Sequence, residues 1–160
     1  MNKKPMLTRR IVSVFCFVFL CTGMLPIYVS AQLPLPLWAK NLGGTGDSKC
    51  AGMQVDKSKN IYITGYFRGT ADFDPTPASH LLTSRGDADI YIPKYSSEGQ
   101  LIWAKSIGGT ELDQPNSLAL NDNGNVVVVG QYKSPLLDAD PSQGVYSLSG
   151  QGSEDAFVIR

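Results

Sequence analysis

The chain repeats one eight-residue segment almost unchanged. Residues 38–45 read Trp-Ala-Lys-Asn-Leu-Gly-Gly-Thr, and residues 103–110 read Trp-Ala-Lys-Ser-Ile-Gly-Gly-Thr. The two copies lie 65 residues apart and share six of their eight residues. Self-similarity at a fixed offset is the signature of a repeat architecture. We therefore expect the chain to use one structural unit twice.

The same offset of 65 relates two predicted β-hairpins. In the first repeat we expect strands over 53–55 and 60–67, joined by a turn over 56–59. In the second repeat the counterparts are strands over 117–120 and 125–129, joined by an Asn-Asp-Asn-Gly turn over 121–124. Both hairpins are therefore predicted at the same place in each repeat.

One added residue then changes the offset to 66, and the repeat continues to Arg160. Each repeat has a polar excursion with a repeated acidic motif, Asp-Phe-Asp-Pro at 72–75 and Asp-Ala-Asp-Pro at 138–141. Further strands are predicted over 38–42, 89–95, 101–107 and 155–160, with a short additional one over 80–84. No window has a sustained helical spacing of apolar residues, and glycine or proline interrupts every long stretch. The sequence therefore predicts an all-β fold.

Strands over 53–55, 60–67, 89–95 and 101–107 describe one twisted antiparallel sheet, which is a propeller blade. We predict β-propeller-type blades of about four antiparallel strands, in two repeats of about 65 residues that form an incomplete ring. The predicted organisation is a signal peptide over 1–31, a proline-rich lead over 32–37, a first repeat over 38–102, and a second repeat over 103–160 that lacks its last strand.

These segments resemble the bacterial β-propeller repeats often described as seven-bladed, which recur in exported and cell-surface proteins. The resemblance covers residues 38–160, and this chain departs from the pattern in its long excursion over 68–87 and in its small number of repeats. It implies a scaffold and no particular chemistry, because a fold does not fix a function. The residues that carry it are 56–60, 61–65, 89–92 with Lys94, Glu98-Gly99, and 103–109.

Two blades are too few for a ring, because propellers typically have about four to eight. The second repeat stops at Arg160, before a counterpart of the 101–107 strand, and the 38–42 strand belongs to no complete preceding blade. We expect either a fragment of a longer chain or a subunit that assembles with copies of itself, with three chains giving six blades. A monomer is expected to be unstable, because a bare sheet face forfeits several kcal/mol at about 25 cal/mol per Å².

Residues 1–31 have the pattern of a secretory signal. A basic start precedes an apolar stretch and small residues at Val29-Ser30-Ala31, so cleavage would leave Gln32 first. The alternative is an uncleaved membrane anchor, since 11–29 approaches the roughly 20 residues that span a bilayer. We expect an exported protein that is secreted, periplasmic or on the cell surface.

Cysteine and charge limit the class of partner. Two of the three cysteines lie in the leader, so we expect Cys50 to be buried and inert, or else available for an intermolecular bond. From Gln32 onward there are 10 basic residues against 14 acidic ones. This balance argues against nucleic acid or an anionic membrane as a partner, because both favour clustered Lys and Arg.

The acidic motifs are the candidate metal site. Asp72, Asp74, Asp138 and Asp140 could supply oxygens to calcium, with further ligands from Asp87, Asp89, Glu154 and Asp155 or from carbonyl groups. The alternative is that aspartate before proline organises a turn by binding backbone amides. No cofactor other than calcium is expected.

The loops suggest a working face. The Asp-Pro excursions and the glycine turns over 43–47 and 108–113 should emerge on one face, where an exposed Phe73 would suit a glycan or a surface protein. The alternative is that these are ordinary solvated turns.

Catalytic signals are weak. His80 is the only histidine, and no serine or cysteine nucleophile motif accompanies it. The glycine run over 43–46 lacks the lysine of a phosphate-binding loop, and Trp38 and Trp103 are expected to pack between blades. We predict a binding or structural scaffold that is not an enzyme. The alternative is a propeller-type carbohydrate-active hydrolase or lyase with its site outside or only partly inside this chain.

Overall fold

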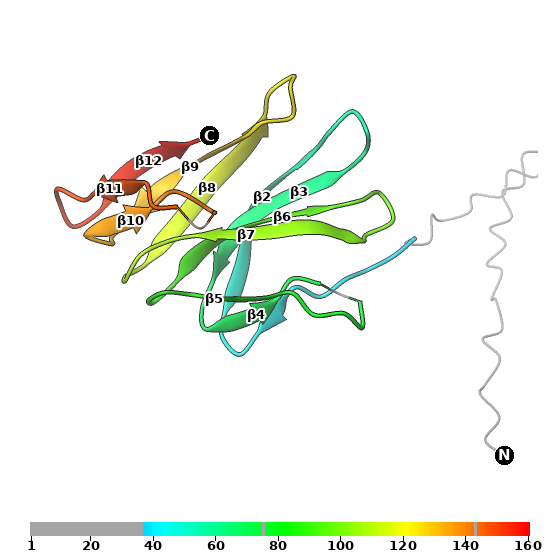
Figure 1. The fold of residues 1–160 in the computed structure, drawn as a ribbon, viewed down its shortest axis with the longest axis horizontal. Helices are drawn as coiled ribbons and strands as arrows, with labels where there is room; N and C mark the ends of the chain where they lie inside the picture. Colours follow the sequence, from blue (N-terminus) through cyan, green and yellow to red (C-terminus); the bar gives the residue numbers. More distant parts are fainter. Residues whose placement is uncertain (1–36, 75, 143) are drawn as a thin grey trace, which may run out of the picture. The chain divides into compact units, whose positions relative to one another are not determined.

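The computed structural model describes residues 37–74, 76–142 and 144–160, and every regular element in these ranges is a β-strand. The all-β prediction is confirmed, and the strands form several small antiparallel sheets (Figure 1). The predicted leader and most of the proline-rich lead lie outside the described residues. Within the described ranges, no helix is long and apolar enough to cross a membrane.

The first sheet has four antiparallel strands in the order β2-β3-β6-β7. They are β2 (Ser48–Val55), β3 (Ile61–Phe67), β6 (Asp89–Tyr95) and β7 (Leu101–Ile107). In the β2–β3 turn, Asp56 Oδ1 accepts the amide hydrogen of Asn60 at 2.8 Å, and Lys59 takes a φ of 65°. In the β6–β7 turn, Gly99 takes a φ of 76°, which favours glycine. The predicted four-stranded unit is therefore confirmed.

The second sheet repeats this order with three strands, β8-β9-β12. They are β8 (Asp113–Leu120), β9 (Val126–Tyr132) and β12 (Asp155–Ile159). Asn121 Oδ1 accepts the amide hydrogens of Asn123 and Asn125, and Gly124 takes a φ of 79°. The Asn-Asp-Asn-Gly turn therefore forms where the sequence predicts it.

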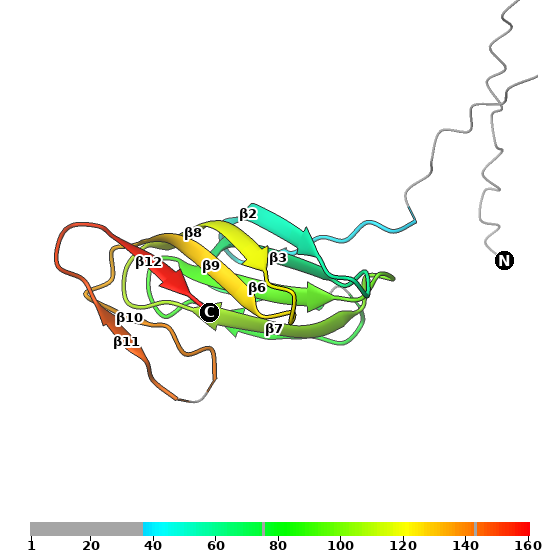
Figure 2. The ribbon, with the colours of Figure 1, turned by 90° about the horizontal axis from the view of Figure 1, so that it is seen from above.

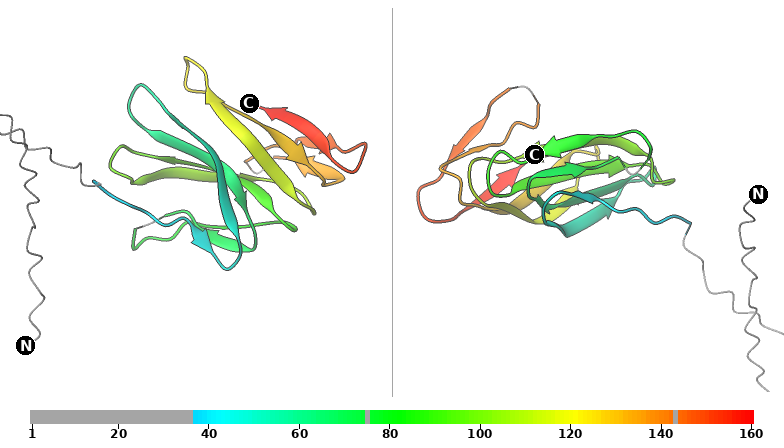
Figure 3. Two further views of the ribbon diagram at one scale, coloured as in Figure 1. Left: turned by 180° about the vertical axis from the view of Figure 1, so that it is seen from behind. Right: turned by 90° about the horizontal axis from the view of Figure 1, so that it is seen from below.

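Each excursion folds into a small two-stranded ribbon beside its sheet (Figures 1 and 3). The first ribbon pairs β4 (Thr70–Asp72) with β5 (Leu81–Thr83), and β1 (Gly43–Gly44) adds to its β4 edge. The second ribbon pairs β10 (Leu136–Asp138) with β11 (Ser147–Ser149). A short strand was predicted near β5 only; β4, β10 and β11 are too short to show periodicity.

The predicted strand over 38–42 is wrong, because the structure has no strand there. Its counterpart β7 is a strand because it forms a ladder with β6. Residues 38–42 have no ladder partner within the described residues. A strand needs such a partner to satisfy its backbone groups.

The first strand of each sheet, β2 or β8, is longer than predicted and contains a β-bulge. The register shifts between Cys50 and Gly52 in the β2–β3 pair, and between Pro115 and Ser117 in the β8–β9 pair. These positions are 65 residues apart. A bulge breaks the period-two alternation, so the first half of each strand carries no clear signal in the sequence.

The main core lies between the two sheets. Strand β8 lies against β2, β3 and β6 of the first sheet, and the stacked sheets are seen from above in Figure 2. The second ribbon contributes to the same core, whereas the first ribbon packs on the first sheet in a separate cluster around Phe67, Phe73 and Tyr91. The main core contains Tyr62, Ile90, Ile92, Ile107, Leu118, Val128, Tyr132, Leu137, Ala139 and Phe157.

Candidate functional site

The first acidic motif organises the tip of the first ribbon. Asp72 Oδ1 accepts the amide hydrogens of Asp74 and His80, both at 2.9 Å. Asp74 Oδ1 accepts the amide hydrogen of Thr76 at 3.0 Å. The amide hydrogens of His80 and Asp74 hold the pKa of Asp72 below its ordinary value. Asp72 therefore closes a turn through backbone amides.

The second acidic motif repeats this geometry. Asp138 Oδ1 accepts the amide hydrogens of Asp140 and Tyr146, both at 3.1 Å, and Asp140 Oδ1 accepts that of Ser142 at 2.8 Å. Burial alone would raise the pKa of Asp138, but these amide hydrogens and Arg85 outweigh it and lower the pKa. These contacts match the turn interpretation. Among the described residues, no group of three or more His, Cys, Asp or Glu side chains is placed to hold a metal ion, and calcium binding stays a prediction.

Arg85 joins the two repeats. Its Nη1 donates to Asp138 Oδ2 at 2.8 Å and to the Gly108 carbonyl oxygen at 3.2 Å. A guanidinium group therefore lies beside Asp138, where the sequence suggested a calcium ion. Asp87 is likewise paired with a cation, because it accepts two hydrogen bonds from Arg68 at 2.7 and 3.0 Å.

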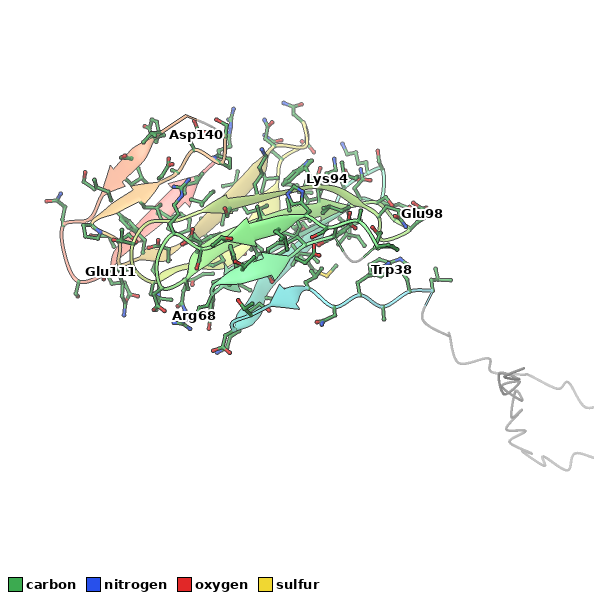
Figure 4. The ribbon with its side chains drawn as sticks, turned by 60° about the horizontal axis from the view of Figure 1, so that its bottom comes forward. Trp38, Arg68, Lys94, Glu98, Glu111 and Asp140 are labelled. Carbon is green, nitrogen blue, oxygen red and sulfur yellow. The ribbon has the colours of Figure 1, made fainter. Side chains whose placement is uncertain are left out.

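The glycine turns and the ribbons meet, as the sequence analysis expected. Gly43 and Gly44 pair with Asp72 and Ala71, and Gly108 forms a bridge with Asp138. Arg68 and Glu111 lie at this loop end of the strands, whereas Glu98 and Trp38 lie at the other end (Figure 4). We call the end with the two glycine turns and the two ribbons the loop surface.

The prediction that Phe73 is exposed is wrong. Phe73 is buried, with its ring centroid 5.5 Å from that of Phe67 and 4.9 Å from that of Tyr91. The Tyr95 hydroxyl also donates to the Phe73 carbonyl oxygen at 2.7 Å. Apolar and acidic residues alternate over 71–74, and this alternation turns Phe73 toward the sheet while Asp72 and Asp74 bind backbone amides. That alternation was the signal in the sequence for a packed ribbon.

The expectation of a buried Cys50 is also wrong, because Cys50 is exposed on β2. Its counterpart Pro115 on β8 is buried. His80 lies in the ribbon with Nε2 3.3 Å from the Ala104 carbonyl oxygen. Trp103 packs edge-on against Tyr62 at 6.0 Å, and Trp38 Nε1 donates to the Ser97 carbonyl oxygen at 2.9 Å. Trp103 therefore packs against the main core, whereas Trp38 is exposed and is held by a hydrogen bond.

Sequence reasoning missed a pair of buried carboxylates beneath the loop surface. Asp113 accepts hydrogen bonds from the Gly109 amide at 2.7 Å and the Ser134 hydroxyl at 2.8 Å. Asp89 is fully buried, and its Oδ1 has no hydrogen-bond partner in the described part of the chain. Burial raises the pKa of Asp89 to about 6, and the negative charge of Asp113 acts in the same direction. Asp89 repeats as Asp155 in the sequence, but nothing in that pattern indicates burial.

Comparison with known proteins gives one distant relative. The chain is 25% identical over 131 residues to an uncharacterized WD repeat-containing protein of Acanthamoeba polyphaga mimivirus. The match covers 72% of this chain and 9% of the relative. No protein-family profile matches the chain. The relative and the two similar sheets together support a β-propeller-type repeat.

Proposed function

We propose that this chain is an exported β-propeller repeat protein that acts as a scaffold and binds a glycan or a surface protein through its loop surface. The observation that carries the proposal is the connection between the two repeats at this surface. Arg85 ties the loop before β6 to Asp138 in the second ribbon, so loops from both repeats are held in one arrangement. Binding residues are commonly found on loops that a rigid scaffold positions.

The charge of the loop surface favours a neutral or basic partner over an anionic one. Acidic side chains come from both repeats, and two of them are paired with Arg68 and Arg85. Carboxylates that already accept backbone hydrogen bonds are pre-oriented, so they lose little entropy when they bind sugar hydroxyls or a basic peptide. The acidic residues of the loops at this end are Asp47, Asp87, Glu111 and Glu154, and the ribbons add Asp72, Asp74, Asp138 and Asp140, of which Asp140 lies beside residues 158–160.

The test is capture of glycans and of surface proteins by the wild type and by a variant with Asp72, Asp74, Asp138 and Asp140 replaced by Asn. Asparagine keeps the oxygen that accepts the backbone amides and removes the charge. Asp122→Asn is the matched control, because Asp122 is exposed in the β8–β9 turn at the opposite end of the strands. We expect the fourfold variant to lose the ligand and the control to keep it. Equal binding by both would contradict the proposal, and glycan turnover that the fourfold variant lacks would instead favour a hydrolase or lyase.

The same variants test calcium. A ligand that binds only the folded state raises the melting temperature as its concentration increases. If calcium binds the acidic motifs, the wild type and Asp122→Asn will show this rise and the fourfold variant will not. No rise in any of the three would leave the carboxylates with their turn-closing role alone.

Export predicts a processed N-terminus. Mass spectrometry of the secreted or periplasmic fraction should find Gln32 as the first residue, because Ala31 ends the small-residue motif that signal peptidases recognise. An intact Met1 in the membrane fraction would favour the anchor. We further propose that more blades, from a longer chain or from other copies, cover the sheets of this scaffold.

A further inference from the structure

The β8–β9 turn contains the one asparagine-glycine pair of the sequence. Asn123 precedes Gly124, whereas every other asparagine and every aspartate precedes a residue with a side chain. The turn lies at the end of its hairpin, and residues 121–125 are exposed (Figure 1). A glycine after asparagine leaves its backbone nitrogen open to the side-chain amide carbon, because no Cβ atom hinders the approach. The chain therefore has one position suited to attack of its own backbone on a side chain.

The Asn123 side chain is available for this reaction. Two other asparagines of the hairpin turns are held by hydrogen bonds: Asn60 Nδ2 donates to Asp56 Oδ2 at 2.8 Å, and Asn121 Oδ1 accepts two backbone amide hydrogens of its own turn. Asn123 is exposed, and its side chain makes no hydrogen bond with any residue that the structure describes. It can therefore rotate toward the next residue without losing a side-chain contact.

Gly124 is accessible as the attacking group. It takes a φ of 79°, and a Cβ atom at this position would have no heavy atom within 4 Å. Its amide hydrogen is bonded to the Asn121 carbonyl oxygen at 2.9 Å, so the nitrogen is released when the turn opens. Exposed turns open locally at a small free-energy cost, because few buried contacts hold them. The reacting atoms can therefore meet while the second sheet stays folded.

The first repeat has the same turn without the reactive pair. Ser58 stands at the position of Asn123. Lys59 stands at the position of Gly124, takes a φ of 65°, and donates its amide hydrogen to the Asp56 carbonyl oxygen at 2.9 Å. One backbone conformation therefore accepts either pair of residues, and only the pair in the second repeat can react.

We propose that Asn123 is modified by the backbone nitrogen of Gly124. This nitrogen forms a bond with Asn123 Cγ, the bond between Cγ and Nδ2 breaks, and the departing ammonia takes up the proton that the Gly124 amide loses. The product is a succinimide ring, and its closure is favoured because both reacting groups belong to adjacent residues. Water then opens the ring at either carbonyl carbon and leaves aspartate or isoaspartate at position 123. No other reactant is needed.

The modification changes the surface between the two hairpin turns. A groove of about 350 Å³ there is lined by residues 54–58 and 120–124, and Lys57 Nζ lies 3.8 Å from Asp122 Oδ1. Either product adds a carboxylate next to Asp122. Isoaspartate also adds a methylene group to the backbone, which breaks the spacing of the amides that bind Asn121 Oδ1. The groove therefore becomes more acidic and the β8–β9 turn loosens, while the β2–β3 turn keeps its structure.

Peptide mapping of the full chain tests the proposal. The purified protein is incubated in mildly alkaline buffer under native conditions, and mass spectrometry follows its peptides over time. We expect Asn123 to gain the mass difference between a hydroxyl and an amino group, and protein isoaspartyl methyltransferase to label part of the product. Fragment spectra separate this site from Asn116 and Asn125, which precede residues with side chains. Asn123 should react at least about tenfold faster than either of them.

Two variants copy the turn of the first repeat. Gly124→Lys keeps Asn123 but puts a side chain beside the attacking nitrogen, at a backbone angle that Lys59 already adopts, and should slow the reaction at least about tenfold. Asn123→Ser removes the reacting amide and should abolish the mass change in this turn. Thermal unfolding before the incubation verifies that both variants are folded.

Three results would overturn the proposal. They are a wild type that forms no isoaspartate, a wild type in which Asn123 reacts no faster than Asn116 and Asn125, and equal rates in the wild type and a folded Gly124→Lys variant. The first two need no variant, so they decide the matter even if a substitution prevents folding. The reaction uses no glycan, calcium or partner, so its outcome is independent of ligand binding at the loop surface.

Discussion

Strands β2 and β8 occupy the same position in the two repeats, but the side chains of β8 are more buried than those of β2. Both follow a glycine turn, both carry a bulge at the same place and both pair with the next strand in the same register. Leu118 of β8 is nevertheless 3% exposed and its counterpart Met53 of β2 is 57% exposed. The difference comes from the face on which each side chain lies, because Leu118 lies in the core between the two sheets, whereas the Met53 side chain is exposed even though β2 also lies against β8. In this chain, the position of a residue in the repeat determines its backbone conformation, and the sheet that packs on that residue determines whether its side chain is buried.

The largest expected effect separates these two residues. We expect Leu118→Ala to lower the free energy of unfolding by about 2–5 kcal/mol, because it leaves a cavity between the sheets. Met53→Ala should change it by less than about 0.5 kcal/mol, as exposed substitutions usually do. Urea denaturation of both variants at one protein concentration measures the difference. Equal losses would mean that β2 is covered in solution as well.

The next effect depends on pH and separates Asp89 from its counterpart Asp155. Burial raises the pKa of Asp89 from 3.8 to about 6, so the folded protein holds this proton more tightly than the unfolded chain does. The contribution of Asp89 to stability is therefore present below about pH 4 and is lost as the pH rises through about 6, by at most about 3 kcal/mol.

We expect Asp89→Asn to remove this fall in stability and Asp155→Asn to keep it, because Asp155 is only partly buried and accepts the amide hydrogens of Gln151 and Gly152. Free energies of unfolding at several pH values from 4 to 7 give the two slopes. Lowered pKa values, such as those of Asp72 and Asp138, act in the opposite direction and are shared by both variants. If both variants keep the wild-type slope, Asp89 is not the group responsible.

A smaller effect is expected from the glycine turns. A Cβ atom at Gly108 would lie 2.3 Å from Asp89 Cγ, whereas one at Gly43 would meet only Ser48 Oγ at 3.5 Å and Asn41 Oδ1 at 4.0 Å. Gly108→Ala should therefore cost about 1–3 kcal/mol, because the buried carboxylate must move. Gly43→Ala should be within about 0.5 kcal/mol of the wild type. A large cost at Gly43, measured by thermal unfolding, would indicate that a neighbouring sheet also packs on the first turn.

The smallest perturbation is a chemical one. Cys50 is exposed, so iodoacetamide should label it in the native protein about as fast as in the urea-unfolded protein. A cysteine introduced as Pro115→Cys, at the buried counterpart on β8, should be labelled more slowly in the native state. Peptide mapping separates these sites from Cys16 and Cys21. Slow native labelling of Cys50 would show that this face of β2 is covered in solution.

The sequence predicted the parts of the fold that depend on local pattern. Alternation and turn residues correctly placed β6, β7 and the hairpin turns, because these signals act within one repeat. The failures at Phe73, at Cys50 and at 38–42 share one cause. Their exposure or pairing depends on which segment of another sheet or ribbon lies beside them, and a residue's own sequence neighbours do not contain that information. The acidic motifs were found by repetition, but their contact with Arg85 links residues 53 positions apart and was not visible.

The glycine pairs determine how closely each glycine turn approaches the neighbouring ribbon. A Cβ atom at Gly44 would lie 1.8 Å from the Thr70 carbonyl oxygen, and one at Gly109 would lie 2.3 Å from the Leu136 carbonyl oxygen. Backbone therefore touches backbone at the same point in both repeats, with no side chain to act as an adjustable spacer. The distance between each glycine turn and its ribbon is thus fixed by the backbone itself. A larger residue at either glycine would force the turn and the ribbon apart, so neither position should accept a side chain.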